Sequence, residues 1–206
     1  INLDLHFDGF YRYDYDEDFL CDFSYALLHI NCKVTNLIFR DFEAEENVLD
    51  EFLTSIVNSK ITKLGIIMSN ISAQTIADVI INPNSNVTHL DLTDNSFDTR
   101  EFEIISNGLL NPVCKVTSLN LRDCVGCWDG EQLLSIINVL KTKGNKIEEL
   151  YLYNCKIGSN GDYVIQALLD SLYDTNCKVE NIWWPTFHIN YYHMNADDIE
   201  IHTGST

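Results

Sequence analysis

Six segments of the chain share one pattern, in which three apolar residues are spaced as apolar-x-x-apolar-x-apolar. They occupy residues 34–39, 61–66, 87–92, 116–121, 147–152 and 179–184, and Leu3 to Leu5 form a fragment of a seventh. The pattern recurs about every thirty residues, and a regular period of this length indicates a solenoid of stacked repeats. This periodicity constrains the fold more than any local helix or strand propensity.

The second half of each segment predicts a short strand that ends in a turn. Alternating apolar and variable residues send the apolar side chains to one face of the strand. Five residues after the central apolar residue, the turn buries backbone groups, which an Asn or Cys side chain can satisfy. Three units carry such a residue: Asn95, Cys124 and Cys155. Three others depart from the pattern: Phe42, Ser69 and Phe187. We therefore expect the turn chemistry to weaken toward both ends of the chain.

A helical pattern follows each turn. Apolar residues recur at three-to-four spacing, as expected for helices with one buried face. The predicted helices cover residues 18–30, 48–58, 72–80, 99–110, 129–141 and 160–173. Asp98 and Glu101 have the spacing of a capping box at the start of one of them. Because a single strand–helix unit cannot bury its own apolar face, stability must come from stacking of the units. The predicted fold class is therefore an α/β solenoid.

The repeats resemble leucine-rich repeats of the ribonuclease-inhibitor type. The resemblance rests on the recurring strand and turn residues and on the shared Cys-Lys-Val spelling that begins at Cys32, Cys114 and Cys177. Similar spellings occur in intracellular repeat proteins, including effector proteins of bacterial pathogens. The resemblance implies a right-handed horseshoe with a parallel sheet on its concave side and helices on its convex side. It also implies protein binding rather than catalysis.

Two regions are expected along the chain. Residues 1–184 form the leucine-rich repeat domain, with about six to seven repeats of which the first is incomplete. Residues 185–206 lack a clear helical pattern and are predicted to be a C-terminal cap or a partly ordered tail. No signal peptide precedes the first repeat, so we expect a processed form or a piece of a longer protein.

The net charge of the chain excludes some classes of binding partner. Acidic residues outnumber basic ones 31 to 13, which gives a formal charge of −18. Such a surface repels phosphate groups and therefore disfavours nucleic acids and anionic membranes as partners. The alternatives that remain are a basic protein partner and a charge that serves only solubility. No apolar run reaches the length of roughly 20 residues that a membrane helix needs.

The seven cysteines do not have the spacing of a disulfide framework. Cys32, Cys114 and Cys177 precede three strands, where we expect them to pack between a helix end and a strand start. Cys124 and Cys127 form a C-x-x-C pair, but the turn position of Cys124 favours a structural thiol over a redox or metal site. Reduced thiols predict a reducing, cytoplasmic compartment, or the host cytosol if the protein is a pathogen effector.

Other chemical motifs are weak. Asp14, Asp16 and Asp18 mimic the start of a calcium loop, but the Gly and Glu that the loop requires are absent. His188 and His193 lie near the C-terminal end without a helix to place them on one face. No nucleophile, phosphate-loop or zinc-protease motif is present. We therefore predict no catalytic residues, no metal and no cofactor.

The concave rows of the predicted sheet contain the candidate binding residues. If the strands stack in parallel, the variable positions that flank each central apolar residue form rows across the sheet. The part of these rows nearer the C-terminus collects Tyr, Trp and Arg, the residue types that dominate binding hot spots. The predicted protein-binding residues are Asp91, Thr93, Asn120, Arg122, Glu149, Tyr151, Tyr153 and Trp183. In the alternative interpretation, the aromatic residues pack beneath the C-terminal segment. Trp184 has an inward position and is predicted to be core.

These observations predict a non-enzymatic module for protein–protein interaction, within an intracellular adaptor or effector. One alternative is a regulator that inhibits a basic enzyme by covering its active site. Another is a non-catalytic piece of a larger enzyme. The sequence leaves the partner's identity and the oligomeric state open.

Overall fold

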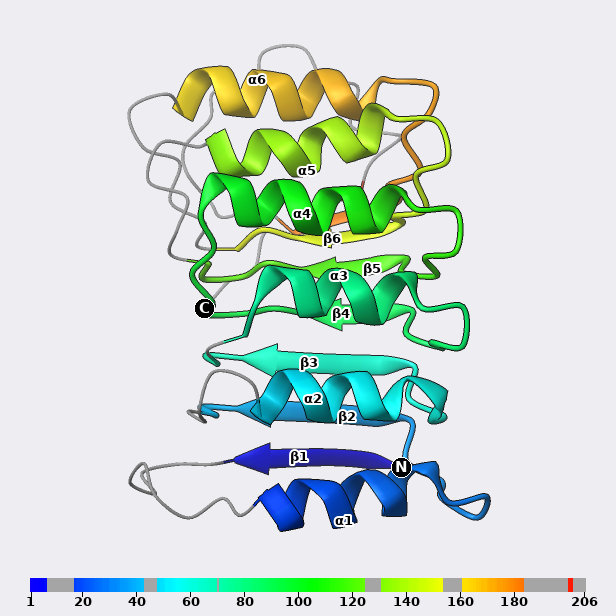
Figure 1. The fold of residues 1–206 in the computed structure, drawn as a ribbon. Coiled ribbons are helices and arrows are strands. Elements are labelled where there is room, and N and C mark those ends of the chain that lie inside the picture. The colour runs from blue at the N-terminus through cyan, green and yellow to red at the C-terminus, as the bar shows by residue number, and fades with distance from the viewer. Residues whose placement is uncertain are drawn as a thin grey trace.

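A computed structural model of the chain describes residues 1–6, 17–42, 48–69, 71–124, 131–153, 161–183 and 200–201. Strands and helices alternate along the chain within these ranges (Figure 1). Several predictions concern residues outside them: Asp14, Asp16, Cys127, Cys155, Trp184, Phe187, His188 and His193. The division of the chain at residue 184 falls in such a range too, so it stays a prediction.

Eight strands and six α-helices make up the described fold, together with a short 3₁₀ helix. The strands are β1 (Asn2–His6), β2 (Asn36–Arg40), β3 (Lys63–Ile67), β4 (His89–Asp91), β5 (Ser118–Asn120), β6 (Glu149–Tyr151), β7 (Asn181–Trp183) and β8 (Glu200–Ile201). The helices are α1 (Glu17–Leu28), α2 (Val48–Ser55), α3 (Ala73–Ile81), α4 (Thr99–Leu110), α5 (Glu131–Lys141) and α6 (Gly161–Leu172). The 3₁₀ helix, Ile56–Asn58, follows α2 directly. All six predicted helices are present, within a turn of the expected bounds.

The strands form one parallel sheet in chain order, from β1 to β8. Its register pairs the central apolar residues of successive units, such as Leu37 with Leu64 and Leu119 with Leu150. The helices line one side of this sheet (Figure 1). This arrangement confirms the predicted α/β solenoid, and the sequence pattern set its register correctly.

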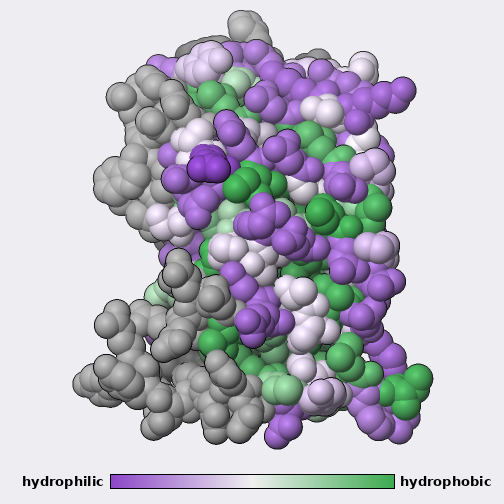
Figure 2. Space-filling model, in the orientation of Figure 1, coloured by the Kyte–Doolittle hydropathy of each residue, from purple (hydrophilic) through white to green (hydrophobic). Residues whose placement is uncertain are grey.

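The core lies between the sheet and the helices. Central strand residues such as Leu90 and Leu150 are buried, as are helix residues such as Ile105 and Ile136. Each fully buried side chain of this size stabilises the fold by about 1.5–3 kcal/mol. Since every unit buries its apolar residues against its neighbours, the core is continuous along the chain. The outer helix surface is mainly hydrophilic, with smaller apolar areas (Figure 2).

Hydrogen bonds from side chains fix the starts of two central helices. The Asp98 carboxylate accepts from the Glu101 N–H at 2.8 Å, and the Glu101 carboxylate accepts from the Asp98 N–H at 2.7 Å. This confirms the predicted capping box of α4. At the start of α3, the Ser72 hydroxyl accepts from the Thr75 N–H at 3.0 Å. A cap of this kind is worth about 1 kcal/mol.

A ladder of polar side chains holds the turns after the central strands. Asn95 is buried, and its Nδ2 donates to the carbonyls of Ile66 at 2.6 Å and Leu92 at 2.9 Å. Its Oδ1 accepts from the Ser69 N–H at 3.0 Å. The Cys124 thiol donates to the Leu92 carbonyl at 3.3 Å. The turn roles predicted for Asn95 and Cys124 are therefore confirmed.

Ser69 departs from the Asn/Cys spelling but keeps its hydrogen-bonding function. Its hydroxyl donates to the Ile67 carbonyl at 2.9 Å and accepts from the Phe42 N–H at 3.3 Å. The ladder therefore extends one unit further toward the N-terminus than the sequence analysis expected. A hydroxyl suffices there because it is both a donor and an acceptor.

The residue before each ladder position adopts a left-handed backbone conformation. The four described cases are Asp41 (φ 56), Met68 (φ 48), Asp94 (φ 57) and Asp123 (φ 55). In each case the N–H donates to a carbonyl of the next unit, as from Asp94 to Arg122 at 3.0 Å. Asp adopts this conformation more readily than most residues do, whereas Met does not.

Lysine side chains connect successive units where the helices end and the strands begin. The ammonium groups of Lys60 and Lys115 donate to carbonyls of the preceding unit, at 2.7 Å to Ile30 and at 2.6 Å to Ser85. Lys146 donates in the same way to the Pro112 carbonyl at 2.8 Å. The sequence signal for this role is a lysine directly before the first apolar residue in five of the six segments, and it was not used in the predictions above. In the remaining segment, Asn86 takes this place and donates to the Ser59 carbonyl at 3.0 Å. Cations also interact favourably with helix C-termini.

The cysteines at the same edge are packed as predicted. Cys114 is fully buried, and its N–H donates to the Asn111 carbonyl at 3.0 Å, just beyond the end of α4. Cys177 is partly buried against the core. Burial raises the pKa of both thiols above the ordinary cysteine value. The thiols therefore stay protonated near neutral pH, which suits a structural role.

Candidate functional site

The sheet surface that faces away from the helices is the predicted binding surface, and we call it the open sheet face. The register places Asp91, Asn120, Tyr151 and Trp183 side by side in one row across β4 to β7. Glu149 lies in the neighbouring row, which contains His89 and Ser118. Thr93, Arg122 and Tyr153 follow the ends of β4, β5 and β6. The structure thus brings all eight predicted residues to one region of the sheet.

Two aromatic rings form a stack at the C-terminal end of this row. The centroids of Tyr151 and Trp183 are 3.9 Å apart and their planes differ by only 3°. Both side chains are partly exposed. The stack is a consequence of register, because parallel pairing puts the two residues directly opposite each other. Stacked pairs contribute about 0.5–1.5 kcal/mol beyond the area they bury, so the two rings hold each other in a fixed orientation.

Arg122 is held in place from two sides. Its guanidinium carbon lies 5.0 Å from the centroid of the Tyr153 ring, within the range of a cation–π contact. Its Nε lies 2.9 Å from the Asp123 carboxylate. The Arg122 side chain is therefore exposed, and its two neighbours restrict its orientation.

Asp91 and Asn120 also stabilise the strand ends. The Asp91 carboxylate accepts from the Thr93 N–H at 3.0 Å and from the Thr93 hydroxyl at 2.6 Å. In the next unit, the Asn120 side-chain oxygen accepts from the Arg122 N–H at 3.0 Å. Such local bonds are a common property of Asp and Asn in turns. Part of the polar character of this surface therefore has a structural cause.

Burial and nearby charges change the pKa of two groups on the open sheet face. Burial, with a smaller effect of the Lys63 charge, lowers the pKa of His89. Burial raises the pKa of Tyr151, and the Glu149 charge, a hydrogen bond to Glu149 and the Asp91 charge add to the increase. Near neutral pH the imidazole of His89 is therefore uncharged and the Tyr151 phenol keeps its proton.

The N-terminal part of the same face has a different character. The Nε of Arg40 donates to both oxygens of the Asp4 carboxylate, at 3.0 and 3.1 Å. Gly65 lies directly beneath Ile38, since a Cβ at Gly65 would come within 3.1 Å of the Ile38 Cγ2. Ile67 is buried. This part of the surface therefore combines an apolar area at Ile38 and Gly65 with the exposed Lys63 and with an Arg40–Asp4 pair whose charges compensate each other.

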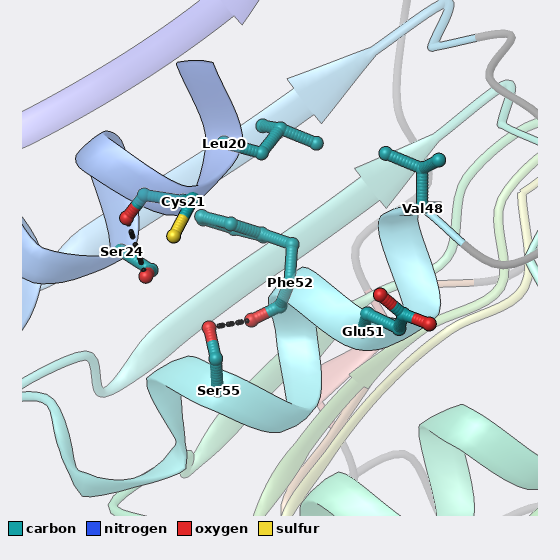
Figure 3. Close-up of a pocket in the computed structure, with 7 residues that line it drawn as sticks. All are labelled: Leu20, Cys21, Ser24, Val48, Glu51, Phe52 and Ser55. Atoms are coloured by element: carbon teal, nitrogen blue, oxygen red, sulfur yellow. Dashed lines mark hydrogen bonds between the residues drawn. The ribbon is translucent and has the colours of Figure 1, made fainter. Parts of the chain in front are cut away.

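A groove between α1 and α2 lies on the other side of the molecule (Figure 3). Its volume is about 220 Å³. The lining residues are Leu20, Cys21, Ser24, Val48, Glu51, Phe52 and Ser55. The hydroxyls of Ser24 and Ser55 donate to carbonyls of their own helices, at 2.7 and 2.6 Å. With few polar groups left to orient a ligand, the groove is a packing defect between helices rather than a binding site.

No group of three or more His, Cys, Asp or Glu side chains is placed to hold a metal within the described ranges. In the same part of the chain, no helix combines the length and the apolar character needed to cross a membrane.

A parallel sheet built from strand–helix repeats, with a ladder of turn residues, defines a leucine-rich repeat solenoid. No family model matches the chain. The chain is 26% identical over 135 residues to NACHT, LRR and PYD domains-containing protein 3 of Homo sapiens and of Macaca mulatta. It is 26% identical over 123 residues to NACHT, LRR and PYD domains-containing protein 12 of Mus musculus.

These similarities cover a small part of the relatives. The match to the human protein involves 63% of this chain but only 12% of the relative's length. The match to the mouse protein involves 59% of this chain and 11% of that relative. Both relatives are named for leucine-rich repeats (LRR), which agrees with the observed repeat architecture.

Proposed function

We propose that the chain is a non-enzymatic module for protein–protein interaction and that it binds its partner on the open sheet face. The observation that carries this proposal is the collection of Tyr151, Trp183, Arg122 and Tyr153 on one preformed, partly exposed surface. These residue types dominate interface hot spots, and rigid presentation lowers the entropic cost of binding.

The fold and the relatives support the same proposal. Repeats of the ribonuclease-inhibitor type, which these units resemble, present their sheet side chains in register to a protein. The relatives are named for three kinds of domain, of which the leucine-rich repeat is one. We therefore propose that the chain acts as the recognition part of a larger intracellular adaptor or effector. Five cysteines in the described ranges are free thiols, which supports a reducing, cytoplasmic compartment.

The test uses two pairs of aromatic residues. Tyr151→Ala with Trp183→Ala removes the stack on the open sheet face. Tyr163→Ala with Tyr173→Ala is the matched control, because both tyrosines are 66% exposed and belong to the helix layer. Proteins captured by the immobilised wild type and by each variant are quantified by mass spectrometry. The strongest interactor is then measured in purified form.

We expect the first pair to weaken binding of the purified partner at least about tenfold and the control pair to have little effect. Both variants should unfold in a single transition by circular dichroism. Equal loss in both pairs would contradict binding on the open sheet face. Loss of the cooperative melt in the first variant alone would show that Tyr151 and Trp183 are core residues, as in the alternative with a C-terminal cap.

The negative charge favours a second candidate, a regulator that covers the active site of a basic enzyme. The formal charge of −18 would attract such a target and accelerate association at low ionic strength. An association rate that does not change with salt would argue against it. A catalytic domain encoded in the same gene would instead favour the third candidate, a non-catalytic piece of a larger enzyme.

A further inference from the structure

The charges of the open sheet face are compensated at its margins but not at its centre. Arg40 pairs with Asp4 at the N-terminal margin, and Arg122 pairs with Asp123 where the strands end. Asp91 and Glu149 lie between these pairs, on β4 and β6. Neither carboxylate has a cation within ion-pair distance among the residues that the structure describes. The centre therefore has two uncompensated negative charges on partly buried side chains.

Ser118 lies in the strand between these two carboxylates. It pairs with His89 on one side and with Glu149 on the other, so its side chain belongs to the open sheet face. Only 7% of the residue is exposed. Its hydroxyl makes no hydrogen bond to any residue in the described ranges. The hydroxyl itself is accessible from the open sheet face rather than fully buried, so it can accept a hydrogen bond from a partner.

Resting on the proposed function, we propose that Asp91, Ser118 and Glu149 together accept an arginine side chain of a protein partner. A planar guanidinium carries five N–H donors and no acceptor, which complements two carboxylates and a hydroxyl. An arginine is a better fit than a lysine, since a guanidinium can bond several acceptors of fixed position at once. The adjacent Tyr151–Trp183 stack supplies an apolar wall for the stem of the side chain.

The surroundings of the site favour a cation and exclude an anion. His89, the basic residue nearest to Ser118 in its row, is uncharged near neutral pH because burial and Lys63 lower its pKa. Glu149 and Asp91 would repel a phosphate or a carboxylate, as would the net charge of the whole chain. A nucleic acid or an anionic lipid therefore does not fit this surface.

The experiment measures binding of a fluorescein-labelled peptide of alternating glycine and arginine by fluorescence polarisation, at near-physiological ionic strength. Matched peptides replace every arginine by lysine or by glutamate. The test variant is Asp91→Asn with Glu149→Gln, which removes two charges with almost no change in shape. The amide oxygen introduced by Asp91→Asn would still accept from Thr93, so we expect the turn to persist. Glu149→Gln alone serves if the double variant does not fold.

The matched control is Asp78→Asn with Asp170→Asn. These two aspartates lie on the exposed surfaces of α3 and α6, where each accepts from a glutamine one turn earlier at 2.8 Å. The control removes the same two charges from the helix layer. It therefore reports how much of the binding is attraction to net charge alone.

We expect the test variant to weaken binding of the arginine peptide at least about tenfold and the control to weaken it less than about twofold. Ser118→Ala should weaken it about tenfold, because one hydrogen bond to a charged group is lost. The lysine peptide should bind more weakly than the arginine peptide, and the glutamate peptide should not bind. Equal losses in the test and control variants would overturn the inference, as would equal affinity for the arginine and lysine peptides.

The outcome is separable from that of the proposed function. Suppose that the Tyr151 and Trp183 variant no longer captures the partner, but the affinity for the arginine peptide is unchanged in the Asp91 and Glu149 variant. The proposed arginine site is then wrong, whereas the proposed interaction module is still supported. If the Tyr151 and Trp183 variant also captures the partner as well as the wild type does, the proposed function is wrong.

Discussion

The same strand–turn–helix unit is tightly closed in the middle of the chain and more open at its N-terminal end. In the middle, Asn95 bonds four neighbouring backbone groups, and α3 and α4 approach so closely that Gly108 lies against Ala77 and Ile80. At the N-terminal end, α1 and α2 leave a groove of about 220 Å³. The parallel register of the sheet is nevertheless the same in both regions. The sheet therefore sets the repeat, and the helix layer adjusts to it.

Aromatic packing replaces the polar ladder in the N-terminal region. Phe42 is buried at the ladder position and its ring contacts Phe39 edge-on, with centroids 5.9 Å apart. Phe39 makes a similar contact with Phe52 at 5.3 Å, and Phe52 stacks on Phe23 at 5.5 Å. The backbone N–H of Phe42 is satisfied by Ser69 of the next unit. An apolar residue is tolerated in one turn because the neighbouring turn supplies the hydrogen bond.

The largest expected effect is at the centre of the ladder. Asn95→Ala would leave the carbonyls of Ile66 and Leu92 and the N–H of Ser69 without their buried partner. We expect a loss of about 3 kcal/mol in the free energy of unfolding, measured by urea denaturation. Ser69→Ala, at the boundary with the aromatic region, should cost only about 1 kcal/mol. An equal loss of unfolding free energy for Asn95→Ala and Ser69→Ala would contradict the proposed difference between the polar ladder and the aromatic region.

The helix layer gives the second test. Gly108→Val would place a side chain where even a Cβ lies 3.3 Å from the Ala77 backbone, so we expect a loss of about 2 kcal/mol. Cys21→Leu adds a larger side chain beside the open groove, and we expect it to change stability by less than about 0.5 kcal/mol. Both are measured by urea denaturation. A similar cost for both would mean that α1 and α2 are packed as closely as α3 and α4.

Periodicity in the sequence predicted the sheet and much of the candidate surface. Once Leu90, Leu119 and Leu150 are aligned, the positions on either side follow, which is why the Tyr151–Trp183 pairing could be expected from the sequence. The ladder roles of Asn95 and Cys124 follow from the same alignment. The strand register can be predicted because it follows from aligning each repeat with the next one along the chain.

Features that depend on the fit between units were not predictable in this way. The groove beside Cys21 and the contact between Gly108 and Ile80 depend on how two helices approach each other, which no single repeat specifies. The isolation of the Ser118 hydroxyl depends on its neighbours in two other strands. The hydrogen bond from the Lys115 ammonium group to the Ser85 carbonyl likewise joins two units, so a single repeat does not specify it.

The smallest expected effects concern the left-handed turn residues, which occur in both regions. Met68→Asn replaces a residue that is strained at φ 48 by one that tolerates it, so we expect a gain of about 0.5–1 kcal/mol at every pH. Asp94→Asn keeps a residue that suits this conformation and removes a charge. Burial, together with the Asp123 charge, raises the pKa of Asp94 above its ordinary value.

The sign of the Asp94 effect follows from linkage. Because the folded state holds the Asp94 proton more tightly than the unfolded chain does, ionisation of this group favours unfolding as the pH rises through its folded-state pKa. We therefore expect Asp94→Asn to stabilise the protein at pH 7 by about 0.3 kcal/mol, a small value since the side chain is exposed and screened by solvent. The gain should disappear below the ordinary aspartate pKa, whereas the gain from Met68→Asn should persist there. Denaturation curves at both pH values separate two effects. Backbone strain is shared by the turns of both regions, whereas the cost of burying the Asp94 charge next to Asp123 arises only where these two residues follow in successive units.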